Sequence, residues 1–82
     1  MKQLKFNPDK DMKELGKYGF RFDKQKCFWY IDRSYFDERY AYQDSIYITN
    51  DGIVRVYGSK ILIILWELIK ENLLVVESDE DE

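Results

Sequence analysis

The chain has 82 residues, a net charge of −3 and no histidine. This length suffices for one domain with one core, and 45% hydrophobic residues mixed with charges of both signs is globular composition. The lack of histidine removes the side chain most often used for proton transfer and metal binding. We therefore expect one domain over residues 1–76 that is not an enzyme, with no catalytic residue, no metal and no cofactor.

The sequence also gives no sign of export or of a membrane anchor. Residues 1–5 lack the apolar run of a signal peptide, and the longest apolar run, at 61–66, is far shorter than the ~20 residues that span a bilayer. Cys27 is the only cysteine, so no disulfide can form within the chain. We expect a cytoplasmic protein.

A short helix is expected near the start of the chain. Asn7 suits the N-cap position and Pro8 suits the first helical position, which predicts a helix over residues 8–15. Gly16 follows as the residue that ends this helix.

Two strands are expected next. Aromatic residues alternate with small or charged residues over 18–23, and a polar turn then leads to a second strand over 27–32. Cys27 begins this second strand on its Trp29 side, which predicts that the thiol is a small core group rather than a reactive one.

A β-hairpin is predicted around Gly52. A two-residue loop would pair Asn50 with Ile53 and would mix polar and apolar residues on both faces. A three-residue loop pairs Ile48 with Val54 and gathers aliphatic side chains on one face. It also places Gly52 at the left-handed position of the turn, so this register is the expected one.

The rest of the chain predicts a helix, a strand and a tail. Ser59 suits the N-cap of an apolar helix over 60–71, whereas a strand over 61–65 leaves the continued 3.6-residue pattern unexplained. Residues 73–76 predict a last edge strand or a packed extension, and 77–82 hold five acids. The expected fold class is α+β: a short N-terminal helix, an antiparallel meander of about four strands, a longer apolar C-terminal helix, a terminal edge strand and a disordered acidic tail.

Two parts of the sequence resemble a family group. The frame over 13–20, with its Gly-Phe pair, and the apolar helical pattern over 65–75 are similar to those of a loose group of small phage and prophage proteins of Gram-positive bacteria. Those proteins combine a short helix that ends at a Gly-Phe, a meander, and an amphipathic helix with a terminal strand. The resemblance implies a phage or mobile-element origin and assigns no functional residue.

The first candidate site is the segment over 32–44, which mixes tyrosine, phenylalanine and arginine with charges and has no clean period. Long loops of this composition are typical of binding sites, because tyrosine and arginine are enriched at hot spots. The expected partner-binding residues are Tyr35, Phe36, Arg39 and Tyr40. The alternative is a surface loop or ragged strand whose aromatic residues complete the core. The acidic residues, Asp44 among them, are interpreted as solvating charges rather than calcium ligands.

The second candidate site is the sheet face opposite the aliphatic one. It carries Phe28, Tyr30, Tyr47, Arg55 and Tyr57. Sheets that stack bases on aromatic rings and hold phosphates with nearby cations bind single-stranded nucleic acid. Three alternatives stay open: a helix covers this face as core, the face binds a protein, or it binds a single strand.

The expected function is that of a non-catalytic protein-binding module, a phage- or mobile-element-encoded modulator of a host or viral protein. One alternative is a single-stranded nucleic-acid-binding protein that uses the aromatic sheet face and the N-terminal lysines, Lys26 among them. The other is a structural homodimer, because Ile63, Ile64 and Trp66 lie on the flanks of the apolar helix and could pair across a two-fold axis.

Overall fold

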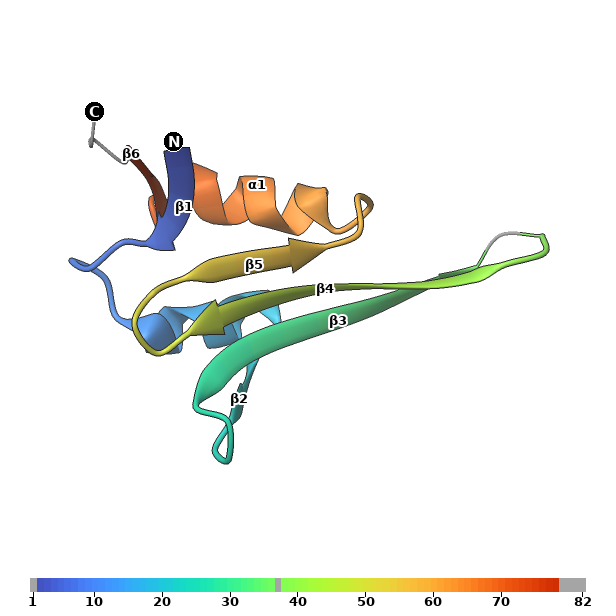
Figure 1. The fold of residues 1–82 in the computed structure, drawn as a ribbon, viewed down its shortest axis with the longest axis horizontal. Helices are drawn as coiled ribbons and strands as arrows, with labels where there is room; N and C mark the ends of the chain where they lie inside the picture. Colours follow the sequence, from blue (N-terminus) through green and yellow to red (C-terminus); the bar gives the residue numbers. More distant parts are fainter. Residues whose placement is uncertain (1, 37, 79–82) are drawn as a thin grey trace.

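The computed structural model describes residues 2–36 and 38–78, in which two sheets and two short helices form (Figure 1). The elements in chain order are β1 (Lys2–Phe6), the 3-10 helix η1 (Met12–Tyr18), β2 (Arg21–Asp23), β3 (Phe28–Phe36), β4 (Ala41–Thr49), β5 (Val54–Tyr57), α1 (Leu62–Lys70) and β6 (Leu74–Ser78). Strands β2, β3, β4 and β5 make one antiparallel sheet in that order, and β1 pairs with β6 in a second sheet.

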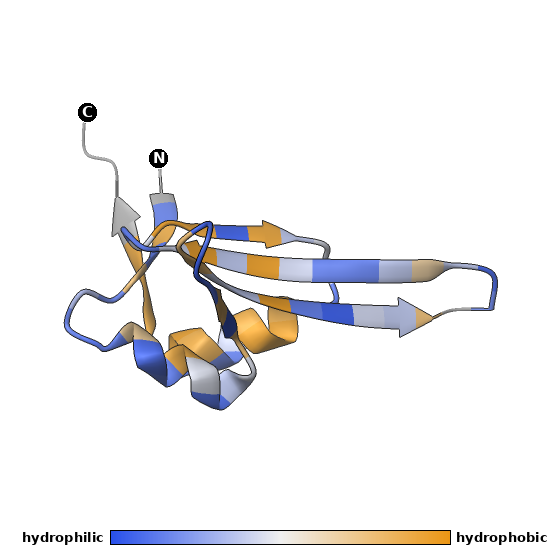
Figure 2. Ribbon diagram, turned by 90° about the horizontal axis from the view of Figure 1, so that it is seen from below, coloured by the Kyte–Doolittle hydropathy of each residue, from blue (hydrophilic) through white to orange (hydrophobic). Residues whose placement is uncertain are grey.

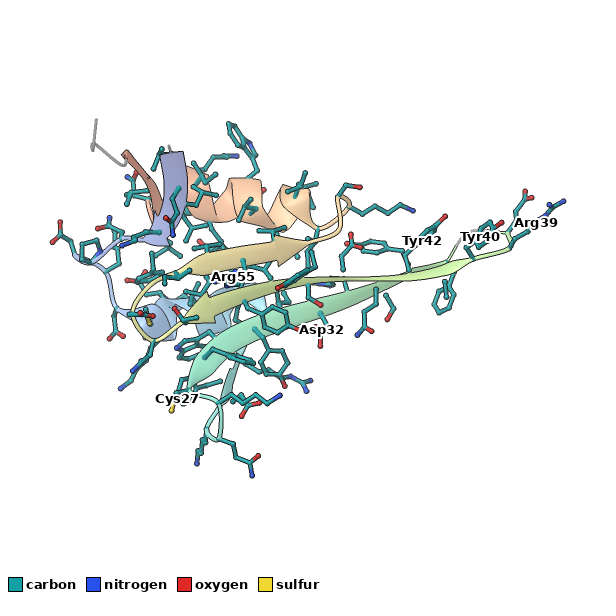
Figure 3. All side chains as sticks on the ribbon, viewed as in Figure 1. Cys27, Asp32, Arg39, Tyr40, Tyr42 and Arg55 are labelled. Atoms are coloured by element: carbon teal, nitrogen blue, oxygen red, sulfur yellow. The ribbon has the colours of Figure 1, made fainter. Side chains whose placement is uncertain are left out.

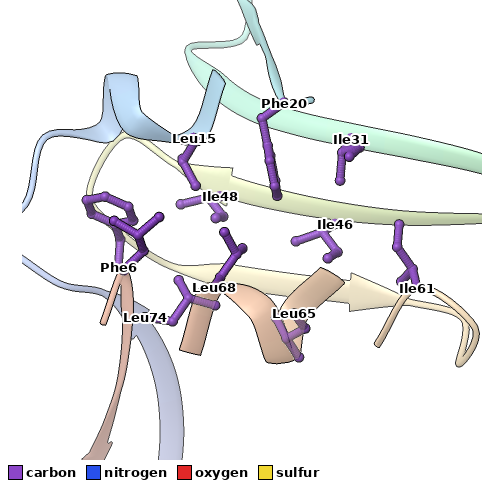
Figure 4. Packing of buried hydrophobic residues seen from close by; sticks show 11 residues of the cluster. Phe6, Leu15, Phe20, Ile31, Ile46, Ile48, Ile61, Leu65, Leu68 and Leu74 are labelled. Atoms are coloured by element: carbon purple, nitrogen blue, oxygen red, sulfur yellow. The ribbon is translucent and has the colours of Figure 1, made fainter. Parts of the chain in front are cut away.

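The core lies on one face of the four-stranded sheet. Ile46 and Ile48 of β4 are fully buried there, against Leu15 of η1 and Leu68 of α1 (Figure 4). Figure 2 shows that η1 and α1 both lie on this side of the sheet. We call the opposite side the outer face, and neither helix covers it.

The β4–β5 hairpin has the expected three-residue loop. Ile48 lies opposite Val54, and the Thr49 N–H donates to the Ile53 carbonyl over 2.9 Å. Gly52 has a φ of 89°, a left-handed conformation that favours glycine. The predicted register is therefore confirmed, because only this register places the aliphatic residues of both strands toward the core.

The predicted balance of helix and sheet is wrong. In place of an α-helix over 8–15, the chain forms the seven-residue 3-10 helix η1, which Asp11 caps by accepting from the Lys13 N–H and which ends at Gly19 rather than Gly16. Helix α1 has nine residues, and these two short helices stand against six strands in the described residues. The protein is mostly β, because β3 and β4 have nine residues each and the segment before η1 also pairs as a strand.

That pairing, β1 with β6, is absent from the prediction. Leu4 lies opposite Val76, and Phe6 lies opposite Leu74, so both ends of the described chain meet in one ladder. The predicted terminal edge strand therefore forms as β6, in a two-stranded sheet with β1. It includes Glu77 and Ser78, the first two residues of the predicted tail. Residues 79–82, the remainder of that tail, lie outside the described residues.

Cys27 does not belong to the core. It is exposed in the turn before β3 and has a φ of 58° (Figure 3). Its thiol donates to the Lys24 carbonyl over 3.7 Å. Cys27 belongs to this turn, so β3 begins at Phe28. The strand continues to Phe36, four residues past the predicted end at Asp32.

Helix α1 is shorter than the predicted 60–71, and its cap is not Ser59. Asp44 of β4 is only 6% exposed, and its Oδ2 accepts from the N–H of Lys60 over 2.8 Å and of Ile61 over 3.1 Å. A carboxylate at a helix N-terminus satisfies backbone donors and interacts favourably with the helix dipole. The interpretation of Asp44 as a solvating charge is therefore wrong, since it joins β4 to α1.

Gly58 makes room for this carboxylate. Its φ is 97°, and a Cβ atom built on it overlaps the Asp44 side chain. A larger residue at this position would therefore force the Asp44 side chain away from the start of α1.

We predict that Gly58→Ala lowers the free energy of unfolding by more than about 2 kcal/mol, because it adds left-handed strain to a steric overlap. The matched control is Gly16→Ala, since a Cβ there meets nothing within 4 Å. Urea unfolding of both variants should show a loss for Gly58→Ala and a change within about 0.5 kcal/mol for Gly16→Ala. Equal stability of the two variants would contradict the overlap.

We also predict that Asp44→Ala destabilises the protein by about 2–3 kcal/mol, because two backbone donors lose a charged acceptor. Asp44→Asn keeps an acceptor oxygen and should lose less. The control is Asp9→Ala, an exposed acid, which should stay within about 0.5 kcal/mol of the parent. Thermal unfolding that ranks Asp44→Ala with Asp9→Ala would refute the role of Asp44 as the cap.

Candidate functional site

The β3–β4 hairpin extends well beyond the rest of the sheet (Figure 1). Strand β2 pairs with β3 only over residues 28–30, and β5 pairs with β4 only over 45–48. Past these positions β3 and β4 pair with each other alone, as far as Phe36 opposite Ala41. We call residues 34–36 and 38–43 the arm. Over residues 32–36 and 41–44, the segment expected to be a loop or a ragged strand is thus a regular two-stranded ribbon.

The end of the arm exposes large side chains. Phe36 is 80% exposed, Tyr40 is 63% exposed and Tyr42 is 40% exposed. Arg39 is exposed beside Tyr40 at the far end of the ribbon (Figure 3). Three of the four predicted partner-binding residues, Phe36, Arg39 and Tyr40, are therefore exposed near the tip, and the alternative that these side chains complete the core is wrong for them. The register places Phe36 on the face of Ala41, whereas Tyr40 lies with Tyr42 on the opposite face of the ribbon.

Tyr35, the fourth predicted residue, lies nearer the base of the arm. It is half-buried opposite Tyr42, and the Lys60 ammonium lies 5.5 Å from the centre of the Tyr35 ring and 4.8 Å from that of Tyr42. A cation at this distance from an aromatic face is attracted to it. Lys60, which the prediction omitted, therefore helps to hold the base of the arm to the start of α1.

Tyr42 is a site residue that the predicted set of four left out. Its ring centre lies 6.4 Å from that of Tyr40, so the two rings form one aromatic surface. The two-residue spacing of Tyr40 and Tyr42 is the signal that could have identified this pair, because side chains two apart in a strand share a face.

The five residues predicted for the outer face do lie together. Tyr47 is the centre of the group: its ring lies 5.2 Å from Phe28 and 5.6 Å from Tyr57, both in edge-to-face geometry. Phe28 contacts Tyr30 in the same way at 6.0 Å. Arg55 is exposed opposite Tyr47 (Figure 3). The alternative in which a helix covers this face is wrong, because both helices pack on the other side.

The outer face is also hollowed. One depression is lined by Lys26, Phe28, Tyr47, Thr49, Arg55 and Tyr57. A second depression beside it shares Lys26, Phe28 and Tyr47 and continues toward β2. Lys26 is one of the N-terminal lysines expected to serve a nucleic-acid site, and it reaches this face from the turn before β3.

Part of the predicted dimer surface is exposed to solvent. On α1, Ile63 is 67% exposed and Trp66 is 59% exposed, whereas Ile64 is half-buried against the core. Leu62, which was not predicted, is 47% exposed next to Ile63. The homodimer therefore stays a prediction with a changed set of residues.

In the chain over 2–36 and 38–78, no helix has the length and apolar character needed to cross a membrane. The same residues contain no group of three histidine, cysteine, aspartate or glutamate side chains arranged to hold a metal ion. Comparison with models of protein families, with curated proteins and with solved structures finds no match to this chain.

Proposed function

We propose that the protein is a non-catalytic binding module whose arm inserts aromatic side chains into an apolar pocket of a partner protein. The observation that carries this proposal is the exposure of Phe36 and Tyr40, at 80% and 63%, on a ribbon that projects past the core. Aromatic rings left this open on a soluble domain cost free energy in water, and a partner's pocket removes that cost.

The composition of the tip favours a protein partner. Phe36 supplies an apolar ring, Tyr40 supplies a ring with a polar end, and Arg39 supplies a guanidinium between them in sequence. Large rings and arginine dominate the binding energy of protein interfaces. The matching partner surface is an apolar pocket with a carboxylate or carbonyl oxygen at its rim, within reach of Arg39.

The contacts at the base of the arm order the ribbon before a partner binds. Asp44 holds the start of α1 beside the ribbon, and Lys60 lies over the Tyr35 and Tyr42 rings. A two-stranded ribbon alone is marginally stable in water, so these contacts reduce the ordering that binding would otherwise require.

The resemblance to small phage and prophage proteins makes a host or viral protein the first class of partner to test. We place the protein in the cytoplasm, where an exposed thiol such as that of Cys27 stays reduced.

A photo-crosslinking amino acid at Tyr40 tests the proposal in the full-length chain. The matched control carries the same amino acid at Trp66, which is 59% exposed on α1, away from the arm. In a lysate of a Gram-positive bacterium, the Tyr40 probe should give discrete protein adducts that persist after nuclease treatment and that the Trp66 probe lacks. Adducts that disappear with nuclease, or that are equal from both positions, would contradict the proposal. Adducts between two copies through Trp66 would support the homodimer instead.

We predict that Phe36→Ala, Arg39→Ala and Tyr40→Ala each weaken binding of the captured partner by on the order of 1–3 kcal/mol, because each removes an anchor. Tyr57→Ala, which removes a 54% exposed ring from the outer face, should leave the affinity unchanged. Calorimetry with the purified partner measures both. If Tyr57→Ala weakens binding as much as Tyr40→Ala, the arm is not the binding element.

A further inference from the structure

We propose that the outer face binds single-stranded nucleic acid, independently of the arm. The face offers ring surfaces, cations at its margins and a hollow that crosses several strands. Together these match the bases, the phosphates and the path of a single strand.

The rings of the outer face are held in place before any ligand arrives. Tyr30, Phe28, Tyr47 and Tyr57 form a continuous series of edge-to-face contacts, with neighbouring ring centres 5.2–6.0 Å apart. Tyr57, at the end of the series, is 54% exposed. Rings fixed in this way lose little rotamer freedom on binding, so stacking of a base on them is not offset by ordering of the side chains.

Cations flank the rings on both sides. Arg55 lies opposite Tyr47 on β5, and Lys26 lines both depressions at the other end of the hollow. Arg21 of β2 lies opposite Tyr30, so it shares the same face. The phosphates of a nucleic-acid strand laid over the rings would therefore meet positive charge at each edge of the outer face.

The two acids of this face bind the protein's own donors. The Asp23 carboxylate accepts from the N–H of Gln25 over 2.9 Å and of Lys26 over 3.1 Å, which forms the turn before β3. The Asp32 carboxylate accepts from the Ser45 hydroxyl over 2.8 Å. Both carboxylates line the second depression and keep their negative charge, whereas no acid lines the first depression, where Arg55 and Lys26 are exposed.

The direction of the hollow suits a nucleic-acid strand that runs across the β-strands of the sheet. Its lining residues come from β5, β4, β3 and the turn after β2. Neighbouring strands lie about 4.8 Å apart, so the hollow extends over about 14 Å. Four-stranded sheets with aromatic residues of this extent stack two or three bases.

The test is fluorescence anisotropy of the full-length protein with a labelled oligothymidylate of about twelve nucleotides and with a duplex of equal length. The single strand should bind more tightly than the duplex, because stacking needs free bases. Tyr57→Ala should weaken single-strand binding at least fivefold, an effect typical of a lost stacking ring. Arg55→Gln should reduce the dependence of log K on log salt by about 0.7, the value for one lost phosphate contact.

Two matched controls separate this surface from the rest of the molecule. Trp66→Ala removes a similarly exposed ring from α1, and Tyr40→Ala removes one from the arm. Neither should change the affinity for the oligonucleotide. The inference is overturned if the single strand fails to bind at about 50 mM salt, if the duplex binds equally well, or if either control weakens binding as much as Tyr57→Ala. If the oligonucleotide does not bind, the arm proposal is unaffected. The crosslinking experiment probes Tyr40 rather than the outer face, and it counts only protein adducts that persist after nuclease treatment.

Discussion

The burial of Ile31, Ile46 and Ile48 determines where everything else in this molecule can lie. These three side chains alternate with polar and aromatic residues along β3 and β4, so only one face of the sheet is apolar enough to hold a helix. Both helices pack on that face, and each is short. The described chain contains no further helix that could cover the other face.

Because the two short helices cover only one face of the sheet, two different surfaces stay exposed. On the outer face, the rings of Phe28, Tyr47 and their neighbours shield one another by edge-to-face packing. On the arm, β3 and β4 continue past the helices, so Phe36 and Tyr40 stay exposed to water, while Lys60 lies over the Tyr35 and Tyr42 rings at its base. Asp44 marks the boundary: it is the last residue of β4, counted from the core toward the tip, that is buried. Both proposed binding surfaces therefore arise from the same geometric constraint.

The sequence predicts well whatever depends on neighbouring residues. The pairing of Ile48 with Val54 follows from aliphatic alternation across a glycine turn, and the apolar helix follows from its 3.6-residue period. It predicts poorly whatever depends on distant segments. Leu4 and Phe6 alternate as a strand does, but their partner lies at the other end of the chain. Asp44 has the local surroundings of a solvated acid, and only the approach of α1 gives it two backbone donors. At the tip of the arm the predicted residues Phe36, Arg39 and Tyr40 are exposed, but the expectation of a loop is wrong, because exposed strands have no apolar period.

The pairing of β1 with β6 has a consequence for how the protein is made. Phe6 leaves the ribosome early, yet its strand partner Leu74 is synthesised 68 residues later (74 minus 6). The hairpins between β2 and β5 join neighbouring segments and can form while synthesis continues, because local contacts are made quickly. The Phe6 N–H can reach the Gly52 carbonyl once the β4–β5 turn is made, but the ladder of β1 with β6 can form only after β6 has left the ribosome. The nascent chain therefore carries an assembled meander and a β1 strand whose ladder with β6 is still open, and a binding chaperone would find that edge accessible during this interval.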